Sequence, residues 1–146
     1  KRLIGVSGDS VQFIDGQIFI NEKKIVRKKI KLDHKIMCGS NSLNVNTYKE
    51  TLPNGVTYIA AYSKTETMMD TDKYVVPENH YFFLGDNRDC SKDSRFLSSV
   101  GYVHKNNLVG KAQFIFFSSD KSIGSFFSFW KWHKSIRFNR FFKKID

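Results

Sequence analysis

Long apolar runs are missing from this sequence. No segment holds about eighteen consecutive apolar residues, the length at which an α-helix can cross a membrane, and no secretory signal peptide opens the chain. Proline is scarce as well, with two residues in 146, and no proline-rich linker divides the chain. We therefore expect that this chain neither spans a membrane nor directs its own export.

Cysteine and closely spaced histidine are equally scarce. Cys38 and Cys90 can pair in an oxidising compartment, but two free thiols are equally compatible with the sequence. The histidines stand far apart and lack the close spacing of a zinc motif: His34, His80, His104 and His133. We expect no metal site and no other cofactor.

Apolar residues make up 40% of the chain and aromatic residues 15%, which is enough for one sizeable core. This composition predicts a single domain over residues 1–146. Strand patterns joined by short turns run through most of the chain. Residues 11–14 and 17–20 flank Asp15-Gly16, a strong hairpin signal, and a second hairpin is expected over residues 43–61 with its turn at 53–55.

Further strands are expected at Tyr81–Leu84 and at Leu108–Phe117, the latter long and largely buried. Helical periodicity of more than two turns is not found before residue 120. The pattern therefore predicts an all-β, antiparallel and partly closed, barrel-like domain.

The formal net charge of +10 is concentrated in two segments. Residues 23–35 are basic without stacking aromatics, which is typical of a solvated strand and loop face. Residues 121–144 mix cations with aromatic side chains, a composition that suits the headgroup region of a membrane. The aromatic side chains of this segment are Phe126, Phe127, Phe129, Trp130, Trp132, Phe138, Phe141 and Phe142.

A polar loop of eleven residues, Gly85–Arg95, directly follows the apolar strand Tyr81–Leu84. Its sequence is Gly-Asp-Asn-Arg-Asp-Cys-Ser-Lys-Asp-Ser-Arg. Alternating aspartate and arginine can satisfy one another's hydrogen bonds and hold a loop in one shape. Charge pattern alone indicates a structural loop at the end of a strand.

The amino terminus changes this interpretation. Lys1-Arg2 is followed by four residues and then Ser7-Gly8-Asp9, and this block together with residues 85–95 resembles two motif blocks of the type I signal peptidases. The second block matches the family at every fixed position. The first departs once, with Ser7 where the family usually has proline, which removes a rigid φ but no reactive group.

The resemblance implies a membrane-associated serine endopeptidase with a Ser-Lys dyad, built on the all-β fold shared with self-cleaving repressor peptidases. It also implies a smaller β-rich insertion, placed at approximately residues 22–75. Lys1 occupies the position of the family's general base, and Ser91 that of the serine that orients this lysine. Arg2, Asp86, Asp93 and Arg95 occupy supporting positions, and we expect Asp93 to pair with Arg95 and Asp86 with Arg2.

A lysine can act as the base only in its neutral form, which apolar surroundings favour. Leu3, Ile4 and Val6 are expected to supply such surroundings for Lys1. The family's nucleophilic serine precedes this lysine in a Ser-Met-x-Pro block, and that block does not occur in this chain. We therefore expect a fragment of a catalytic domain that is incomplete at its amino terminus and inactive alone.

The implied substrates are exported preproteins with small residues before the cleavage site, processed on the outer face of a bacterial inner membrane, with the lipid surface as a second partner. Two alternatives remain. One is a self-cleaving repressor-type peptidase, which shares the Ser-Lys fold but lacks the block at residues 85–95. The other is a basic β-domain that binds single-stranded nucleic acid. The resemblance favours the signal peptidase, for which no nucleic acid is expected.

Overall fold

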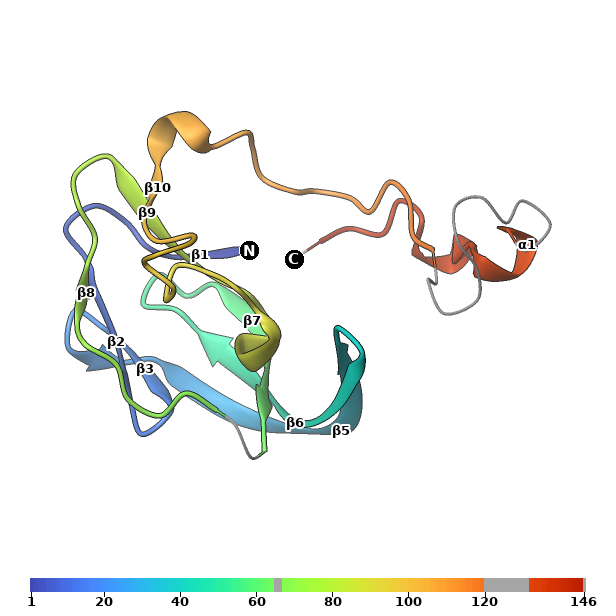
Figure 1. Ribbon diagram of the computed structural model, residues 1–146, viewed down its shortest axis with the longest axis horizontal. Coiled ribbons are helices and arrows are strands. Elements are labelled where there is room, and N and C mark those ends of the chain that lie inside the picture. The colour runs from blue at the N-terminus through green and yellow to red at the C-terminus, as the bar shows by residue number, and fades with distance from the viewer. Residues whose placement is uncertain (65–66, 120–131, 146) are drawn as a thin grey trace. The chain divides into compact units, whose positions relative to one another are not determined.

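The computed structural model describes residues 1–64, 67–119 and 132–145 (Figure 1). The chain forms two compact units, Lys1–Leu108 and Val109–Asp146. The first unit is built from strands and two short 3-10 helices, η1 (Arg88–Cys90) and η2 (Lys105–Asn107). The prediction of an all-β protein with antiparallel pairing is confirmed.

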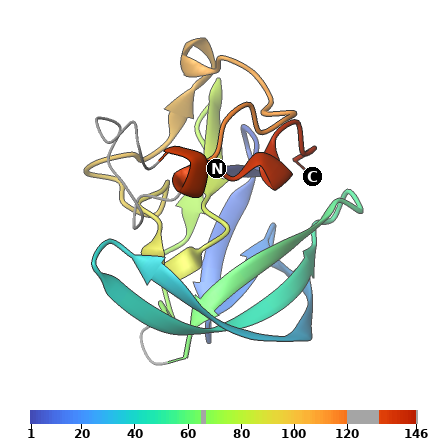
Figure 2. The same ribbon diagram turned by 90° about the vertical axis from the view of Figure 1, so that its right-hand side faces the viewer.

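Three separate antiparallel sheets make up the first unit. One sheet has the order β1 (Arg2–Gly5), β9 (His80–Leu84) and β10 (Val103–His104). Another has the order β4 (Lys23–Lys24), β3 (Gln17–Ile20), β2 (Ser10–Ile14) and β8 (Tyr74–Val75). The last consists of β5 (Val26–Cys38), β6 (Asn41–Thr51) and β7 (Thr57–Ser63), and Figure 2 shows its long, curved strands.

Both predicted hairpins are present. Asp15 and Gly16 connect β2 to β3 with φ of 49° and 65°, the positive values that a two-residue primed turn requires. β6 and β7 pair from Val45↔Ser63 to Thr51↔Thr57, and Gly55 in their turn has a φ of 82°. Each turn therefore lies where a glycine can adopt a positive φ with little strain.

The core of the first unit collects alternate residues of these strands. Val11 and Phe13 of β2 are buried with Ile18 of β3, and Phe82 and Leu84 of β9 join them. Because alternate side chains of β9 are anchored in this core, the end of the strand is fixed in place. The polar loop that begins at Gly85 therefore starts from a rigid support.

The second unit corrects one prediction. Residues 108–117 were expected to form a long buried strand, but they contain a single bridge, Phe114↔Lys144, and Phe116 and Phe117 are exposed. A strand needs partners along its length. In the described part of the chain the backbone of this segment is hydrogen-bonded to Lys105 at its start, through Leu108, and to residues near the carboxyl terminus, through Gln113 and Ile115. The prediction of a long buried strand at residues 108–117 is therefore wrong.

Two short helices complete the described part of the second unit: α1 (Trp132–Ser135) and η4 (Phe138–Arg140). The aromatic segment predicted to meet a membrane is residues 121–144, of which residues 121–131 lie outside the described residues. In its described part, Phe138 and Phe142 are exposed, and Phe141 packs against Phe117. Among the described residues, no helix has the length and apolar character needed to cross a membrane.

Candidate active site

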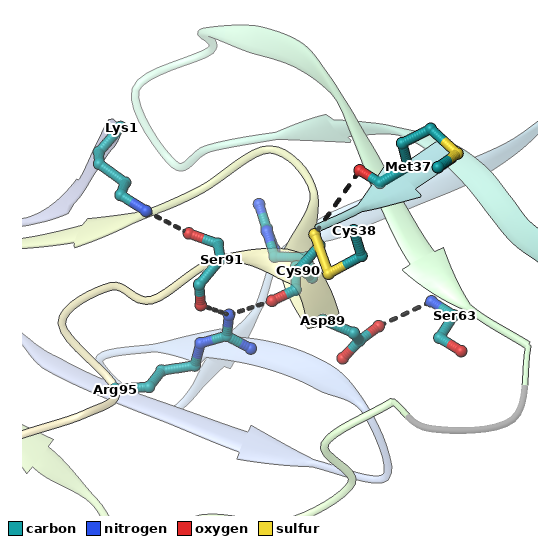
Figure 3. The surroundings of a disulfide bond; sticks show 9 residues. Lys1, Met37, Cys38, Ser63, Asp89, Cys90, Ser91 and Arg95 are labelled. Carbon is teal, nitrogen blue, oxygen red and sulfur yellow. Dashed lines mark hydrogen bonds between the residues drawn. A yellow bond between two sulfur atoms is a disulfide. The ribbon is translucent and has the colours of Figure 1, made fainter. Parts of the chain in front are cut away.

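Antiparallel pairing of β1 with β9 brings the two ends of the predicted site together. Arg2 lies opposite Leu84, so Lys1 stands beside the start of the polar loop at Gly85. The Nζ atom of Lys1 donates a hydrogen bond of 2.5 Å to the Oγ atom of Ser91 (Figure 3). Two residues that are 90 positions apart in sequence therefore meet through the register of one strand pair.

The surroundings of Lys1 differ from the expectation. Ile4 is buried in the core, but Leu3 and Val6 are exposed, and the Lys1 side chain is exposed as well. The described residues therefore do not supply the apolar cover that was expected from Leu3, Ile4 and Val6.

Gly85 allows Ser91 to reach Lys1. A Cβ atom at residue 85 would lie 2.0 Å from Ser91 Oγ and 2.4 Å from Ser91 Cβ, distances that non-bonded atoms do not adopt. The φ of Gly85 is not in the left-handed region, so space and not backbone conformation demands glycine here. Sequence reasoning placed this glycine in the motif but gave it no role.

The pairing expected of Arg2 and Asp86 is present. Arg2 donates from Nε and Nη2 to the two carboxylate oxygens of Asp86 at 3.0 Å and 3.1 Å. The guanidinium also lies over the ring of Tyr58, 4.3 Å from its centroid. The two-point pair links β1 to the first residues of the loop on a surface that is partly open to water.

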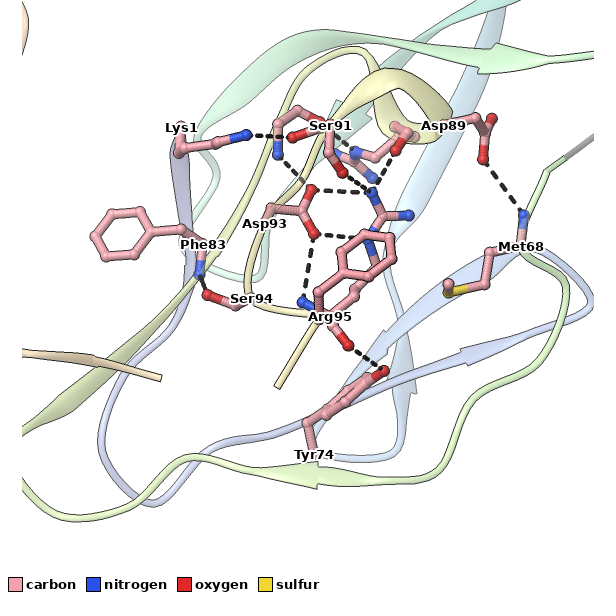
Figure 4. A network of polar contacts seen from close by, with 12 residues as sticks. Lys1, Met68, Tyr74, Phe83, Asp89, Ser91, Asp93, Ser94 and Arg95 are labelled. Atoms are coloured by element: carbon pink, nitrogen blue, oxygen red, sulfur yellow. Dashed lines mark hydrogen bonds and ion pairs between the residues drawn. The ribbon is translucent and has the colours of Figure 1, made fainter. Parts of the chain in front are cut away.

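The pairing expected of Asp93 and Arg95 is also present, and it is fully buried (Figure 4). Arg95 donates to both oxygens of Asp93 at 2.8 Å and 2.9 Å, and the backbone N–H of Gly85 donates to Asp93 at 2.9 Å. Burial disfavours the charged carboxylate, but these donors outweigh it and hold the pKa of Asp93 below its ordinary value. Arg95 also donates to the carbonyl of Arg88, which ties the last residue of the loop to the start of η1.

A second buried ion pair was missed by sequence reasoning. Arg88 is 1% exposed and donates to Glu50 of β6 at 2.7 Å and to the hydroxyl of Tyr62 at 2.6 Å. Tyr62 in turn donates to Glu50, and Tyr58 accepts from Arg88 at 3.3 Å. Burial raises the pKa of both tyrosines. Burial alone would lower the pKa of Arg88, but its attraction to Tyr62 and Glu50 is stronger, and the pKa of Arg88 is raised. The two tyrosines therefore stay neutral and Arg88 stays charged at neutral pH.

Asp89 and Cys90 fasten the loop to its neighbours. Asp89 accepts hydrogen bonds from the backbone N–H of Ser63 at 2.7 Å and from the hydroxyl of Thr67 at 3.0 Å. Cys90 forms a disulfide with Cys38, with a Cα–Cα distance of 5.5 Å. The sequence had left the pairing of the two cysteines open.

Metal ligands do not gather in the described part of the chain: no three histidine, cysteine, aspartate or glutamate side chains there lie close enough to hold an ion. The arrangement consists instead of an amine and a hydroxyl in contact at the surface, held by buried arginine–carboxylate pairs. Such an amine can accept a proton from a third group when it is neutral, while Ser91 holds one of its hydrogens.

A family model and curated relatives of this chain are all described as signal peptidases. The family model described as "Signal peptidase, peptidase S26" matches residues 1–117. Curated proteins named "Signal peptidase I" from Rickettsia prowazekii (strain Madrid E) and Rickettsia bellii (strain OSU 85-389) are 41% and 42% identical, over 99% of this chain and 58% and 53% of their own lengths. The chain thus spans little more than half of these relatives. No solved structure matches it significantly.

Proposed function

The chain belongs to the signal peptidase family, peptidase S26, and we propose that it supplies the lysine half of the Ser-Lys dyad of a membrane-associated signal peptidase I. Lys1 is the general base and Ser91 orients it. The supporting groups are Arg2, Asp86, Asp93 and Arg95. The observation that carries this proposal is the hydrogen bond from Lys1 Nζ to Ser91 Oγ, because it joins the two motif blocks at the atoms that the chemistry needs.

The mechanism follows from the valences of a neutral amine. An amine has two N–H bonds and one lone pair, and donation of one N–H to Ser91 Oγ limits the directions in which the lone pair can point. The lone pair takes the proton of a serine hydroxyl as that oxygen attacks the carbonyl carbon of the scissile peptide bond. The resulting ammonium then returns the proton to the leaving amine, and water completes the hydrolysis of the acyl-enzyme.

The nucleophilic serine, in this proposal, belongs to the part of the parent protein that this chain does not span, since the relatives are almost twice as long as their matched region. That part would also cover Lys1, which is exposed here. It would complete a partly closed barrel around the sheets of the first unit. The sheet β5–β6–β7, within residues 26–63, would be the core of the β-rich insertion proposed at about residues 22–75.

Lys1→Ala in the full-length parent tests the assignment. The variant should lose preprotein cleavage by a factor of about a thousand or more, because it deletes the base while opening no cavity in the core. Lys92→Ala is the matched control, since Lys92 is an exposed lysine of the same loop. Circular dichroism should be unchanged in both variants. Cleavage retained by Lys1→Ala would remove Lys1 from the mechanism.

Ser91→Ala should act more gently than Lys1→Ala, because it leaves the amine in place and removes only the group that orients it. We expect kcat to fall by about tenfold to a hundredfold with little change in KM. Ser91→Thr keeps the hydroxyl and should recover part of the rate. An unchanged kcat in Ser91→Ala would end the role given to Ser91.

We propose exported preproteins with small residues before the cleavage site as substrates, and the outer face of a bacterial inner membrane as the location. A cleavage site that emerges at the lipid surface favours an enzyme whose own edge lies among the headgroups. Residues 121–144 carry the cations and aromatic rings suited to that depth. The chain should therefore co-sediment with anionic vesicles and be released by salt, and a Trp130→Ala, Trp132→Ala variant that binds unchanged would contradict this role.

A further inference from the structure

The disulfide between Cys38 and Cys90 ends one residue before Ser91 (Figure 3). Cys90 is the last residue of η1, and Cys38 is the last residue of β5, at the tip of the hairpin formed by β5 and β6. The bond thus links the sheet β5–β6–β7 covalently to the loop that carries Ser91. In the motif of residues 85–95, Cys90 stands at the single position between Asp89 and Ser91 that the resemblance does not fix.

Strong contacts hold the loop on either side of Ser91. Before it, Arg88 and Asp89 are tied to Glu50 and Ser63 at 2.7 Å each. After it, Asp93 is paired with Arg95. Ser91 itself has weaker links: its carbonyl accepts from Arg95 at 3.5 Å, and its hydroxyl contacts Lys1, which is exposed.

The position of Ser91 tolerates little error. The Ser91 side chain lies in the space left by the missing Cβ of Gly85. If the backbone of Ser91 moved toward Gly85, the side chain would collide with it, and if it moved away, the hydrogen bond to Lys1 would lengthen. A covalent bond at the preceding residue limits both movements. Hydrogen bonds that are partly exposed to water restrain a backbone much less.

We propose that the Cys38–Cys90 disulfide is a positioning element of the catalytic site, which sets Ser91 at the distance that orients Lys1. This proposal rests on the proposed function. Because the bond forms only where thiols are oxidised, the site is completed once the chain has reached an oxidising compartment. A reducing compartment leaves the same fold with Ser91 unfixed and the base poorly aimed.

The redox step is an exchange with a dithiol. Two electrons pass from the dithiol to the protein, the sulfur–sulfur bond of Cys38 and Cys90 breaks, and each sulfur takes up a proton as a thiol. The dithiol is left as its own disulfide. Oxidation by a disulfide of higher potential reverses each of these changes.

The 146-residue chain allows a test that does not need catalysis. With 13C-labelled lysine, the Lys1 Cε signal is assigned by its loss in Lys1→Arg and followed by NMR in the oxidised chain, after dithiothreitol, and in Cys38→Ser. Both treatments should move the signal toward its position in Ser91→Ala. Dithiothreitol should cause no change in the Cys38→Ser, Cys90→Ser double variant, which is the matched control.

An unmoved Lys1 signal, in a chain shown by thiol titration to carry two free thiols, would overturn the proposal. The ring signals of Phe82 report whether the core survives, since this side chain is fully buried in the first unit. If reduction abolishes them, Cys38→Val with Cys90→Ala replaces the bond by apolar groups and is measured in the same way. Loss of the core in that variant also overturns the proposal, because the bond would then hold the fold and not the site.

In the full-length parent, reduction should lower kcat by at least about tenfold and leave KM nearly unchanged, as expected for a misdirected base. The two proposals fail differently. A parent that cleaves no preprotein in either redox state contradicts the proposed function, while the NMR result still stands. A parent that cleaves equally well in both states contradicts the positioning role alone.

Discussion

The loop Gly85–Arg95 has a buried side and an open side, and the two are built from the same kinds of residue. On the buried side, the Arg88–Glu50 and Arg95–Asp93 pairs exclude water almost completely. On the open side, the Arg2–Asp86 pair and the Lys1–Ser91 contact face solvent. An arginine–aspartate pair occurs on both sides, so residue type alone does not tell which side holds the loop and which carries the proposed site.

The two sides of the loop differ in how far their ion pairs are buried. An ion pair in a dry environment leaves a costly unpaired charge when one partner is removed, whereas an exposed pair exchanges its partner for water. The buried pairs therefore act as fixed supports. The open contacts restrain the chain less, so the geometry of the proposed site depends on these buried supports and on the Cys38–Cys90 bond.

The largest effect is expected at Glu50. Glu50→Ala leaves the Arg88 guanidinium buried without its carboxylate, and we expect the free energy of unfolding to fall by about 3–5 kcal/mol. Urea unfolding followed by circular dichroism measures it. Glu22→Ala is the matched control, because Glu22 forms an exposed pair with Lys73 and its loss should lower the free energy of unfolding far less than the loss of Glu50. Equal losses in the two variants would show that burial does not separate the two sides.

The contribution of the buried Asp93 to stability should depend on pH. Its pKa is lowered in the folded state, so its contribution to stability is present above the ordinary carboxyl pKa and is lost as the pH falls toward the folded value. Asp93→Asn should therefore destabilise the chain at pH 7 by about 2 kcal/mol, and the difference from the unsubstituted chain should shrink below about pH 4. Unfolding measured between pH 7 and pH 2 decides this. A difference independent of pH would contradict the lowered pKa.

The open side and part of the buried side could be predicted from the sequence. Asp93 and Arg95 are two residues apart, and their mutual pairing follows from that spacing. Arg2 and Asp86 required the family's two blocks as well, because strand register and not local sequence brings them together. The hairpin at Asp15-Gly16 was predictable because the turn itself demands those residues.

The burial of Glu50 and the absence of a strand at residues 108–117 could not be predicted from the sequence, and the reasons are related. Glu50 lies 38 positions from Arg88, and its burial depends on the loop folding back over β6 and β7. The segment 108–117 has the apolar pattern of a strand, but pairing depends on what lies beside it. The disulfide stayed open because two cysteines carry no information about their distance in space.

Gly85→Ala should have an intermediate effect and should connect the two sides. The added Cβ would overlap with Ser91 Oγ, so the loop must shift, and we expect a loss of about 1–3 kcal/mol in unfolding free energy. The Lys1 NMR signal should also move toward its position in Ser91→Ala. Gly110→Ala is the control, since a Cβ there meets no atom within 4 Å. A Lys1 signal unchanged in Gly85→Ala would mean that Ser91 can move without losing Lys1.

The smallest effect is expected at the open pair of Arg2 and Asp86, and a double-mutant cycle can measure it. Arg2→Ala and Asp86→Ala, singly and together, should give a coupling energy below about 1 kcal/mol, because water replaces the partner that is lost. The backbone carbonyl of Asp86 still accepts from Ala61 in every variant, so the loop keeps its path. Added salt should reduce this coupling, whereas the same cycle at Asp93 and Arg95 should give a larger coupling that salt hardly changes. Couplings of equal size and equal salt dependence would show that both sides of the loop are equally strong supports, and that burial does not distinguish them.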